Sequence, residues 1–267
     1  MEDLNFGFAF TITLLAGLAT GIGSLVALFA RKTNTTLLSF SLGLSAGVML
    51  YVSFVELLNH GNEALIASHG HYLGSIYSLL ALFAGMGFIA IIDALIPSET
   101  NPHEARCVEQ LGADCNKRGL TRMGLMSALA IAIHNFPEGI ATFASAAEDP
   151  SLGLAVGVAV AIHNIPEGIA VSVPIYYATG SRHKAFWYSL LSGLAEPLGG
   201  VIAFALLMPF ITPELIGALL SGVAGVMIYI AIDELLPAAR EYGKAHISIY
   251  GLALGMAIMA ASLIILE

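Results

Sequence analysis

Long apolar runs, separated by short polar or turn segments, follow one another along the whole chain. Eight of them are long enough to cross the hydrocarbon core of a bilayer as helices, for which about 20 residues suffice. The pattern therefore predicts an all-α integral membrane protein with eight transmembrane helices. The expected spans are residues 6–30, 36–58, 74–97, 121–146, 151–178, 185–209, 213–237 and 247–266.

Composition supports this class. Of the 267 residues, 57% are hydrophobic and only 11% are charged, whereas a soluble domain carries about 25% charged residues. The net charge of −9 gives no sign of nucleic-acid binding, because the acidic residues are scattered. Glu2 and Asp3 stand where a secretory signal carries Lys or Arg, so the first apolar run is interpreted as a retained helix.

The basic residues predict an orientation. All 10 Lys and Arg follow an odd-numbered span or open the next one. By the positive-inside rule, the loops that carry them face the cytoplasm, and both termini lie outside the cell. The longest of these loops, residues 98–120, is polar. The opposite side is acidic and bears histidines. Such a face would concentrate cations, and the alternative, that these loops are simply polar, stays open.

Part of the chain is repeated. AGVMLYVSFVELL begins at Ala46 in span two, and AGVMIYIAIDELL begins at Ala224 in span seven. Spans one to three and six to eight then form one unit used twice, in opposite orientations because five spans separate equivalent helices. The prediction is a single transporter domain, 1–267, with a 3+2+3 inverted-repeat plan: units 6–97 and 185–266 flank helices within 121–178. Such a plan places a substrate site near the midplane.

A near-identical hexapeptide occurs in spans four and five, within AIAIHNFPEGIA and AVAIHNIPEGIA. In each copy a His and a Glu spaced i, i+4 share one helix face. The Asn after each His points about 100° away, towards a neighbouring position. The Pro before each Glu removes a backbone donor, so each helix is expected to kink there. The residues are His134, Asn135, Pro137 and Glu138, and His163, Asn164, Pro166 and Glu167.

This chemistry predicts a divalent metal site. Polar side chains in a bundle can simply join helices by hydrogen bonds, but buried glutamates need a neutralising charge, and no Lys or Arg lies in a span core. Imidazole, carboxylate and amide ligands suit Zn²⁺, Fe²⁺ or Mn²⁺, whereas Cu⁺ favours sulfur and Ca²⁺ or Mg²⁺ favours an all-oxygen set. The ion, Zn²⁺ or Fe²⁺, is expected to be a transported substrate, and no organic cofactor is expected.

Other intramembrane polar residues are candidates for the same route. Glu196, within SGLAEPLGG, is expected to face the same cavity. Met49, Ser53 and Glu56 form one stripe of span two that could line a path, although Met49 as core filler is the preferred interpretation. The repeat pairs Glu56 with Glu234, which would mark the outer entrance and the inner exit.

Two weaker patterns have simpler explanations beside them. His103, Glu104, Cys107 and Cys115 have a loose zinc-site spacing, but a solvated loop is the preferred interpretation. Small-xxx-small pairs such as Gly43 with Gly47 allow close helix packing, either within the chain or in a homodimer.

The sequence resembles the ZIP family of metal transporters over nearly its whole length. HNFPEG, HNIPEG, SGLAEPLGG and the IPSETNPHE that comes after span three carry the resemblance. It implies an eight-helix bundle with a binuclear site between spans four and five. A fifth ligand from span two stays open between Met49 and Glu56. One metal would bind His134, Glu138, His163 and Glu167, and the other Asn135, Asn164 and Glu196, with Glu138 and Glu167 shared as bridges.

The function predicted from the sequence is uptake of Zn²⁺, and also Fe²⁺ or Mn²⁺, into the cytoplasm by alternating access, with no catalytic residues. The protein would be a multi-pass protein of the bacterial inner membrane whose partners are the lipid bilayer and divalent ions. One alternative is an intramembrane zinc-dependent hydrolase, although the chain has no HExxH motif. A second is a haem-binding electron carrier, which leaves Glu138 and Glu167 without a role.

Overall fold

The computed structural model describes residues 6–29, 35–95, 132–133, 135–147, 149–207, 212–241 and 245–266. Every regular element in these residues is helical, and one helix covers 135–147. The others are α1 (Phe6–Phe29), α2 (Thr35–Tyr51), the π-helix η1 (Val52–Leu57), α3 (Leu58–His69), α4 (His71–Leu95), α6 (Pro150–Thr179), α7 (Arg182–Gly193), α8 (Ala195–Leu207), α9 (Pro213–Ile230), the π-helix η4 (Ala231–Leu235), α10 (Leu236–Glu241) and α11 (Ala245–Leu266).

The predicted all-α membrane class is confirmed. Seven helical stretches among the described residues are long and apolar enough to cross a membrane, and they match seven predicted spans. The remaining span, 121–146, is described only in part, and the loop 98–120 lies outside the described residues. Helix α4 is mostly exposed, and its exposed side chains include Leu80, Phe83 and Ile91. Such an apolar exposed face suits contact with lipid.

The second span is longer than the sequence indicated. The predicted end was residue 58, but α2, η1 and α3 run without interruption to His69. The polar residues after 58 suggested a loop, yet Gly61 and Leu65 are buried on the face that packs against α9. A Cβ on Gly61 would lie 2.7 Å from the carbonyl oxygen of Gly217. The segment is therefore a helix because one of its faces is covered by another helix.

Local signals at the helix ends explain the short connections. The Asp149 side chain accepts hydrogen bonds from the backbone N–H groups of Ser151 and Leu152, and Pro150 starts α6. Thr212 caps α9 in the same way. Both combine a favoured N-cap residue with a proline in the first turn. Gly180, with a φ of 65°, ends α6 in the left-handed region that glycine tolerates.

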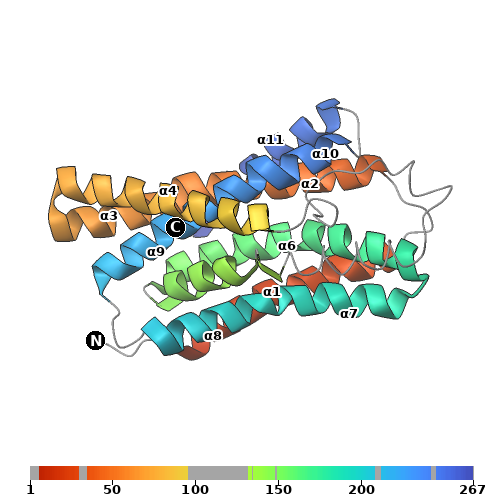
Figure 1. Ribbon diagram of the computed structural model, residues 1–267, viewed down its shortest axis with the longest axis horizontal. Coiled ribbons are helices and arrows are strands. Elements are labelled where there is room, and N and C mark those ends of the chain that lie inside the picture. Colours follow the sequence, from red (N-terminus) through yellow and green to blue (C-terminus); the bar gives the residue numbers. More distant parts are fainter. Residues whose placement is uncertain are drawn as a thin grey trace.

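The helices form two groups (Figure 1). The first, called the site group, contains α1, α6, α7, α8 and the 135–147 helix, and the second, called the outer group, contains α2, η1, α3, α4, α9, η4, α10 and α11. Each group contains helices from both predicted repeat units, because α1 packs on α6 and α7 while α2 packs on α11. The main contact between the groups joins α2 and α6.

Glycines hold each group together. In the site group, Gly23 approaches the backbone of Ile165, and Gly168 approaches that of Thr20, so closely that a Cβ would overlap the carbonyl oxygen. In the outer group, Gly47 lies in the same way against Leu252. Such small residues let transmembrane backbones meet. Among the described helices, no glycine contact of this kind joins the two groups.

The two π-helices occupy equivalent places in the sequence repeat. Residue 46 corresponds to 224, so η1 (Val52–Leu57) corresponds to 230–235, and η4 covers Ala231–Leu235. A π-helix is a rare feature that is often associated with function. Its occurrence at both places indicates that the repeated sequence specifies the same local backbone twice.

Candidate metal centre

A buried cluster of donors lies where the two hexapeptide copies meet. Glu138, His163 and Glu167 each present one ligand atom, and these atoms lie within 4.8 Å of one another. The shortest contact joins the two copies, with 3.2 Å between His163 Nε2 and Glu138 Oε2. The cluster therefore combines a residue of the 135–147 helix with two residues of α6, and neither copy forms it alone.

The orientation of His163 suits metal binding. Its Nδ1 lies 3.1 Å from the carbonyl oxygen of Ala159, one turn earlier in α6. That carbonyl can only accept, so Nδ1 carries the proton and Nε2 of the neutral ring keeps its lone pair. Nε2 is the atom that faces Glu138. A backbone acceptor behind a ligating histidine is a common way to fix its tautomer.

The two asparagines turn their carbonyl oxygens towards the interior. Asn135 donates from Nδ2 to the carbonyl of Ser192, at 3.2 Å. Asn164 donates from Nδ2 to the carbonyl of Ala16, at 2.9 Å, and also to the Glu196 carboxylate. Because the amide nitrogens are engaged, Oδ1 of each side chain remains, and neither Oδ1 has a hydrogen-bond partner among the described residues. These atoms are available as neutral oxygen ligands.

Glu196 reaches this region because its helix is interrupted. Helix α7 ends at Gly193 and α8 begins at Ala195, with Leu194 in a turn between them. Pro197 cannot donate a backbone hydrogen bond to Gly193, which weakens the helix at this point. Glu196 is fully buried in the first turn of α8, and Asn164 donates to its Oε1. It lies outside the three-residue cluster but is linked to α6 through Asn164.

The glycines of the two hexapeptides have a packing role that sequence reasoning missed. Gly139 lies against the backbone carbonyl of Glu196, and Gly168 lies against that of Thr20. A side chain at either position would push the metal-site helices away from α8 or α1. The signal was present in the sequence, since a glycine comes directly after the glutamate in both copies, but it did not reveal which helix each one contacts.

Three carboxyl groups, two in the cluster and one beside it, are buried away from solvent. Glu138, Glu167 and Glu196 are at most 2% exposed. Apart from the contact with His163, both oxygens of Glu138 and Oε2 of Glu196 have no hydrogen-bond partner among the described residues. Ionised carboxylates in such surroundings are costly unless a positive charge accompanies them. A divalent ion supplies that charge, and the imidazole and carboxylate donors suit Zn²⁺.

The other predicted residues lie around this cluster or away from it. His134 lies outside the described residues. Met49 and Ser53 are fully buried, and Ser45, one turn before Met49, donates to the carbonyl of His163 at 3.4 Å. This bond places against α6 the face of α2 that carries Met49, one of the predicted path residues. Among the described residues, the cluster that could hold a metal includes neither Glu56 nor the buried Glu234. Oε1 of Glu56 lies 3.9 Å from Nε2 of His60.

Comparison with known proteins identifies the family. The family profile described as ZIP zinc transporter matches residues 96–263. The chain belongs to the ZIP family. A relative from Lysinibacillus sphaericus, named zinc transporter ZupT, is 57% identical over 267 residues, covering 99% of both chains. Proteins of the same name from Oceanobacillus iheyensis and Streptococcus mutans are each 58% identical, covering 98% and 96% of this chain and 99% and 97% of their own.

Membership of the ZIP family agrees with the resemblance found in the sequence. The buried cluster of Glu138, His163 and Glu167 therefore lies in a chain whose family and relatives are named as zinc transporters. The similarity extends over nearly the whole length of the relatives, so it includes both hexapeptide copies and the helices packed around them.

Proposed function

We propose that this protein takes up Zn²⁺ into the cytoplasm across the bacterial plasma membrane, as a multi-pass transporter and not an enzyme. The observation that carries the proposal is the buried cluster of Glu138, His163 and Glu167 inside a bundle of membrane-spanning helices. Intramembrane ionisable residues mark ion pathways by default. The bacterial relatives named as zinc transporters support this interpretation, and Fe²⁺ and Mn²⁺ are further candidate substrates for the same donors.

The proposed site is binuclear. His134 would complete the ligand set of Glu138, His163 and Glu167 for one ion, since it precedes Glu138 by one helical turn. The free Oδ1 atoms of Asn135 and Asn164 and the Oε2 of Glu196 support a second ion nearby, with Glu138 and Glu167 as bridges. The amide nitrogens of the asparagines, held by backbone and carboxylate acceptors, would keep the oxygens directed at the ion.

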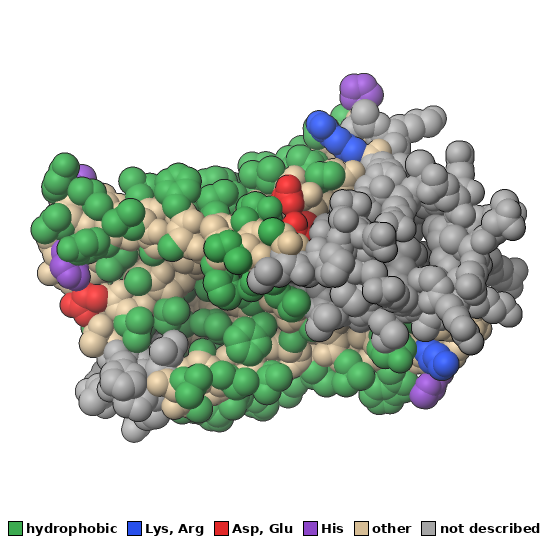
Figure 2. Space-filling view, in the orientation of Figure 1, with side chains coloured by type: hydrophobic (Ala, Val, Ile, Leu, Met, Phe, Trp, Pro, Cys, Tyr) green, Lys and Arg blue, Asp and Glu red, His purple; other side chains and the backbone are tan. Residues whose placement is uncertain are grey.

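The inverted-repeat plan is part of the proposal. It is supported by the two π-helices at equivalent positions and by the packing. Helix α2 packs on α11, and their counterparts in the other repeat unit, α9 and α4, pack on each other in the same way. The exposed Arg182, Lys184 and Arg240 belong to helix ends that the sequence predicts to be cytoplasmic. In Figure 2 the visible Lys and Arg side chains lie in the right half of the view, away from the left end where α3 and α4 meet in Figure 1. This asymmetry supports both termini facing outward.

Alternating access would arise from the two helix groups. Close glycine contacts join helices within the site group and within the outer group, so each is suited to move as a body. The ion would enter from outside, bind the site group, and become exposed to the cytoplasm when this group shifts against α2 and the rest of the outer group. The bound charge offsets the buried carboxylates during that movement. Met49, Ser53, Glu56 and Glu234 are proposed to line the path.

Zinc flux into proteoliposomes tests the function. We expect Glu138→Gln and His163→Ala to lower uptake to the level of protein-free liposomes, because each removes a donor while leaving the helix contacts in place. Glu63→Gln is the matched control: it makes the same chemical change on the exposed surface of α3 and should leave uptake unchanged. Unchanged flux in both site variants would contradict the assignment.

The same assay separates transport from the hydrolase alternative. A transporter moves zinc in liposomes that contain no peptide or lipid substrate for cleavage, and flux depends on the zinc gradient. A hydrolase would release products without ion movement. The family match favours transport.

A further inference from the structure

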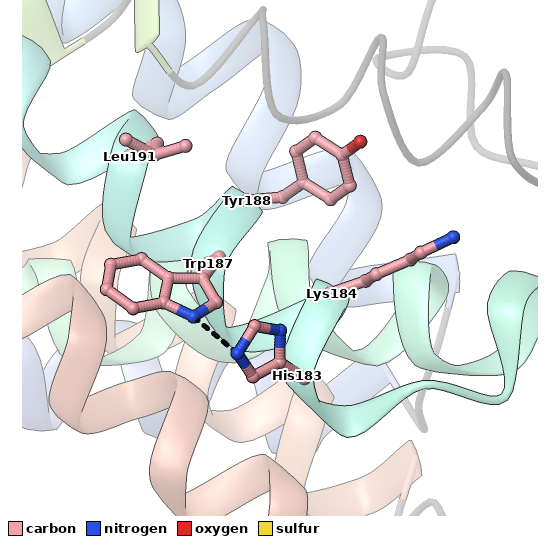
Figure 3. Close-up of a pocket in the computed structure, with 5 residues that line it drawn as sticks. All are labelled: His183, Lys184, Trp187, Tyr188 and Leu191. Carbon is pink, nitrogen blue, oxygen red and sulfur yellow. Dashed lines mark hydrogen bonds between the residues drawn. The ribbon is translucent and has the colours of Figure 1, made fainter.

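A shallow surface pocket lies at the start of α7, on residues that do not belong to the metal centre. Its lining consists of His183, Lys184, Trp187, Tyr188 and Leu191. Figure 3 shows the rings of Trp187 and Tyr188 set apart from each other, with Leu191 beyond them and the side chains of His183 and Lys184 at the other end. The pocket therefore changes from charged and polar to apolar along the helix.

Hydrogen-bond donors gather at the polar end. Trp187 donates from Nε1 to His183 Nε2, at 2.9 Å, so the proton of the neutral imidazole is on Nδ1 and is left to donate elsewhere. The Lys184 ammonium is exposed beside it, and none of the described residues that line the pocket is a carboxylate. These groups come just after the first residue of α7, where the positive end of the helix dipole adds to their field. The polar end is complementary to an anion.

The apolar end continues along the membrane-spanning part of α7 and α8. Trp187, Leu191 and Leu198 are 45%, 57% and 55% exposed, although they lie in a stretch long and apolar enough to span a bilayer. Large apolar side chains that remain exposed there face acyl chains. Trp187 lies between this surface and the charged end, which is the place tryptophan favours at a membrane interface.

We propose that this pocket binds an anionic phospholipid of the leaflet at the start of α7, the cytoplasmic leaflet in the predicted orientation. The phosphate would lie at Lys184 and His183, and an acyl chain would extend along Leu191 and Leu198. Charge complementarity selects the occupant: this leaflet carries anionic lipids that attract basic residues next to spanning helices. The proposal concerns lipid binding alone and does not depend on zinc transport.

Trp187 makes the test direct, because it is the one tryptophan in the sequence. The purified protein is reconstituted with phosphatidylcholine containing increasing fractions of brominated phosphatidylglycerol or brominated phosphatidylcholine, and quenching of Trp187 fluorescence is measured. We expect brominated phosphatidylglycerol to quench at a lower mole fraction than brominated phosphatidylcholine, with an affinity about fivefold higher. This is the effect of one basic residue near an anionic surface. Lys184→Gln should remove this preference.

Arg240→Gln is the matched control, because Arg240 is an exposed basic residue on α10 of the outer group and should leave the preference intact. Inorganic phosphate added to phosphatidylcholine vesicles separates a lipid from a free anion, and it should neither change the fluorescence nor compete with the brominated lipid. Equal quenching by both lipids in the wild type, equal loss in both variants, or effective competition by phosphate would each overturn the proposal.

Discussion

Gly139 lies directly against the main-chain carbonyl of Glu196, so closely that a Cβ on the glycine would overlap the carbonyl oxygen. This contact joins the 135–147 helix to the first turn of α8. It holds the backbone of Glu138, the residue before the glycine, next to the helix turn that carries Glu196. The close approach of one glycine therefore holds together two helices that carry buried carboxylates.

Gly139→Ala should destabilise the protein by about 1–3 kcal/mol, because the added methyl group has to displace backbone and not a flexible side chain. Thermal unfolding of the detergent-purified protein, monitored by circular dichroism, measures the loss. Gly87→Ala in α4 is the control, since among the described residues nothing from a neighbouring helix lies within 4 Å of a Cβ at that position. Equal unfolding temperatures for the two variants would contradict the close contact.

Asn164→Ala should reduce the zinc bound at saturation by about half. The substitution removes the amide that donates to Ala16 and Glu196 and also removes the free Oδ1, while the cluster of Glu138, His163 and Glu167 remains. In the proposed binuclear site, only the second ion loses its ligands. Metal analysis of purified protein after equilibrium dialysis gives the stoichiometry.

Asn59→Ala controls for loss of an asparagine, because the side chain of this exposed residue of α3 donates only to the carbonyl of Val55, one turn earlier in η1, among the described residues. It should bind as much zinc as the wild type. If Asn164→Ala also retains the full amount, the second metal position does not involve Asn164, and if it binds none, the two positions are not separable.

Deletion of Phe54 should abolish zinc uptake. Removing one residue from η1 closes the wide π-turn into a regular α-helical turn. Because the wide turn accommodates the extra residue, the parts of the span before and after it keep nearly the same relative rotation, and Ser45 stays on the face that meets α6. The expected loss comes from η1 itself, where Ser53 and Glu56 change direction when the turn closes. Flux in proteoliposomes is the measurement, with size-exclusion chromatography to verify that the variant remains folded.

Phe54→Ala keeps the chain length and should retain uptake, because Phe54 is 49% exposed. Deletion of Ile232, the equivalent residue in η4, should have the same effect as deletion of Phe54 if both π-helices serve the same purpose. Normal flux after either deletion would show that the π-turn at that place is dispensable.

Much of the fold could be predicted because membrane insertion depends on local properties. The length and hydropathy of each apolar run identified seven spans that the described residues contain. The i, i+4 spacing of His163 and Glu167 placed both on one face of α6, and the duplicated hexapeptide suggested that Glu138 would join them. In the structure these three side chains lie together in one buried cluster, while metal binding there and the role of His134 stay predictions.

The end of the second span could not be predicted in the same way. Residues after 58 are polar enough to resemble a loop, and they are helical because α9 covers Gly61 and Leu65. The break at Leu194 could not be predicted from the sequence either, because prolines have different effects in this chain. Pro166 lies within the uninterrupted α6, whereas Pro197 lies just after the break between α7 and α8. The effect of a proline depends on what its neighbours can offer to the freed backbone groups.

By itself, then, the sequence determined a membrane-embedded all-helical chain, its internal repeat and the kinds of donor atom available to a metal. The tertiary structure decided which helices pack together, so that Gly139 contacts Glu196, Gly168 contacts Thr20, and both asparagines turn their oxygens inward. The physical reason is the distance along the chain over which each effect acts. Hydropathy and helical periodicity act within a few residues, whereas the direction of an amide or the approach of a glycine depends on backbone atoms far away in the sequence.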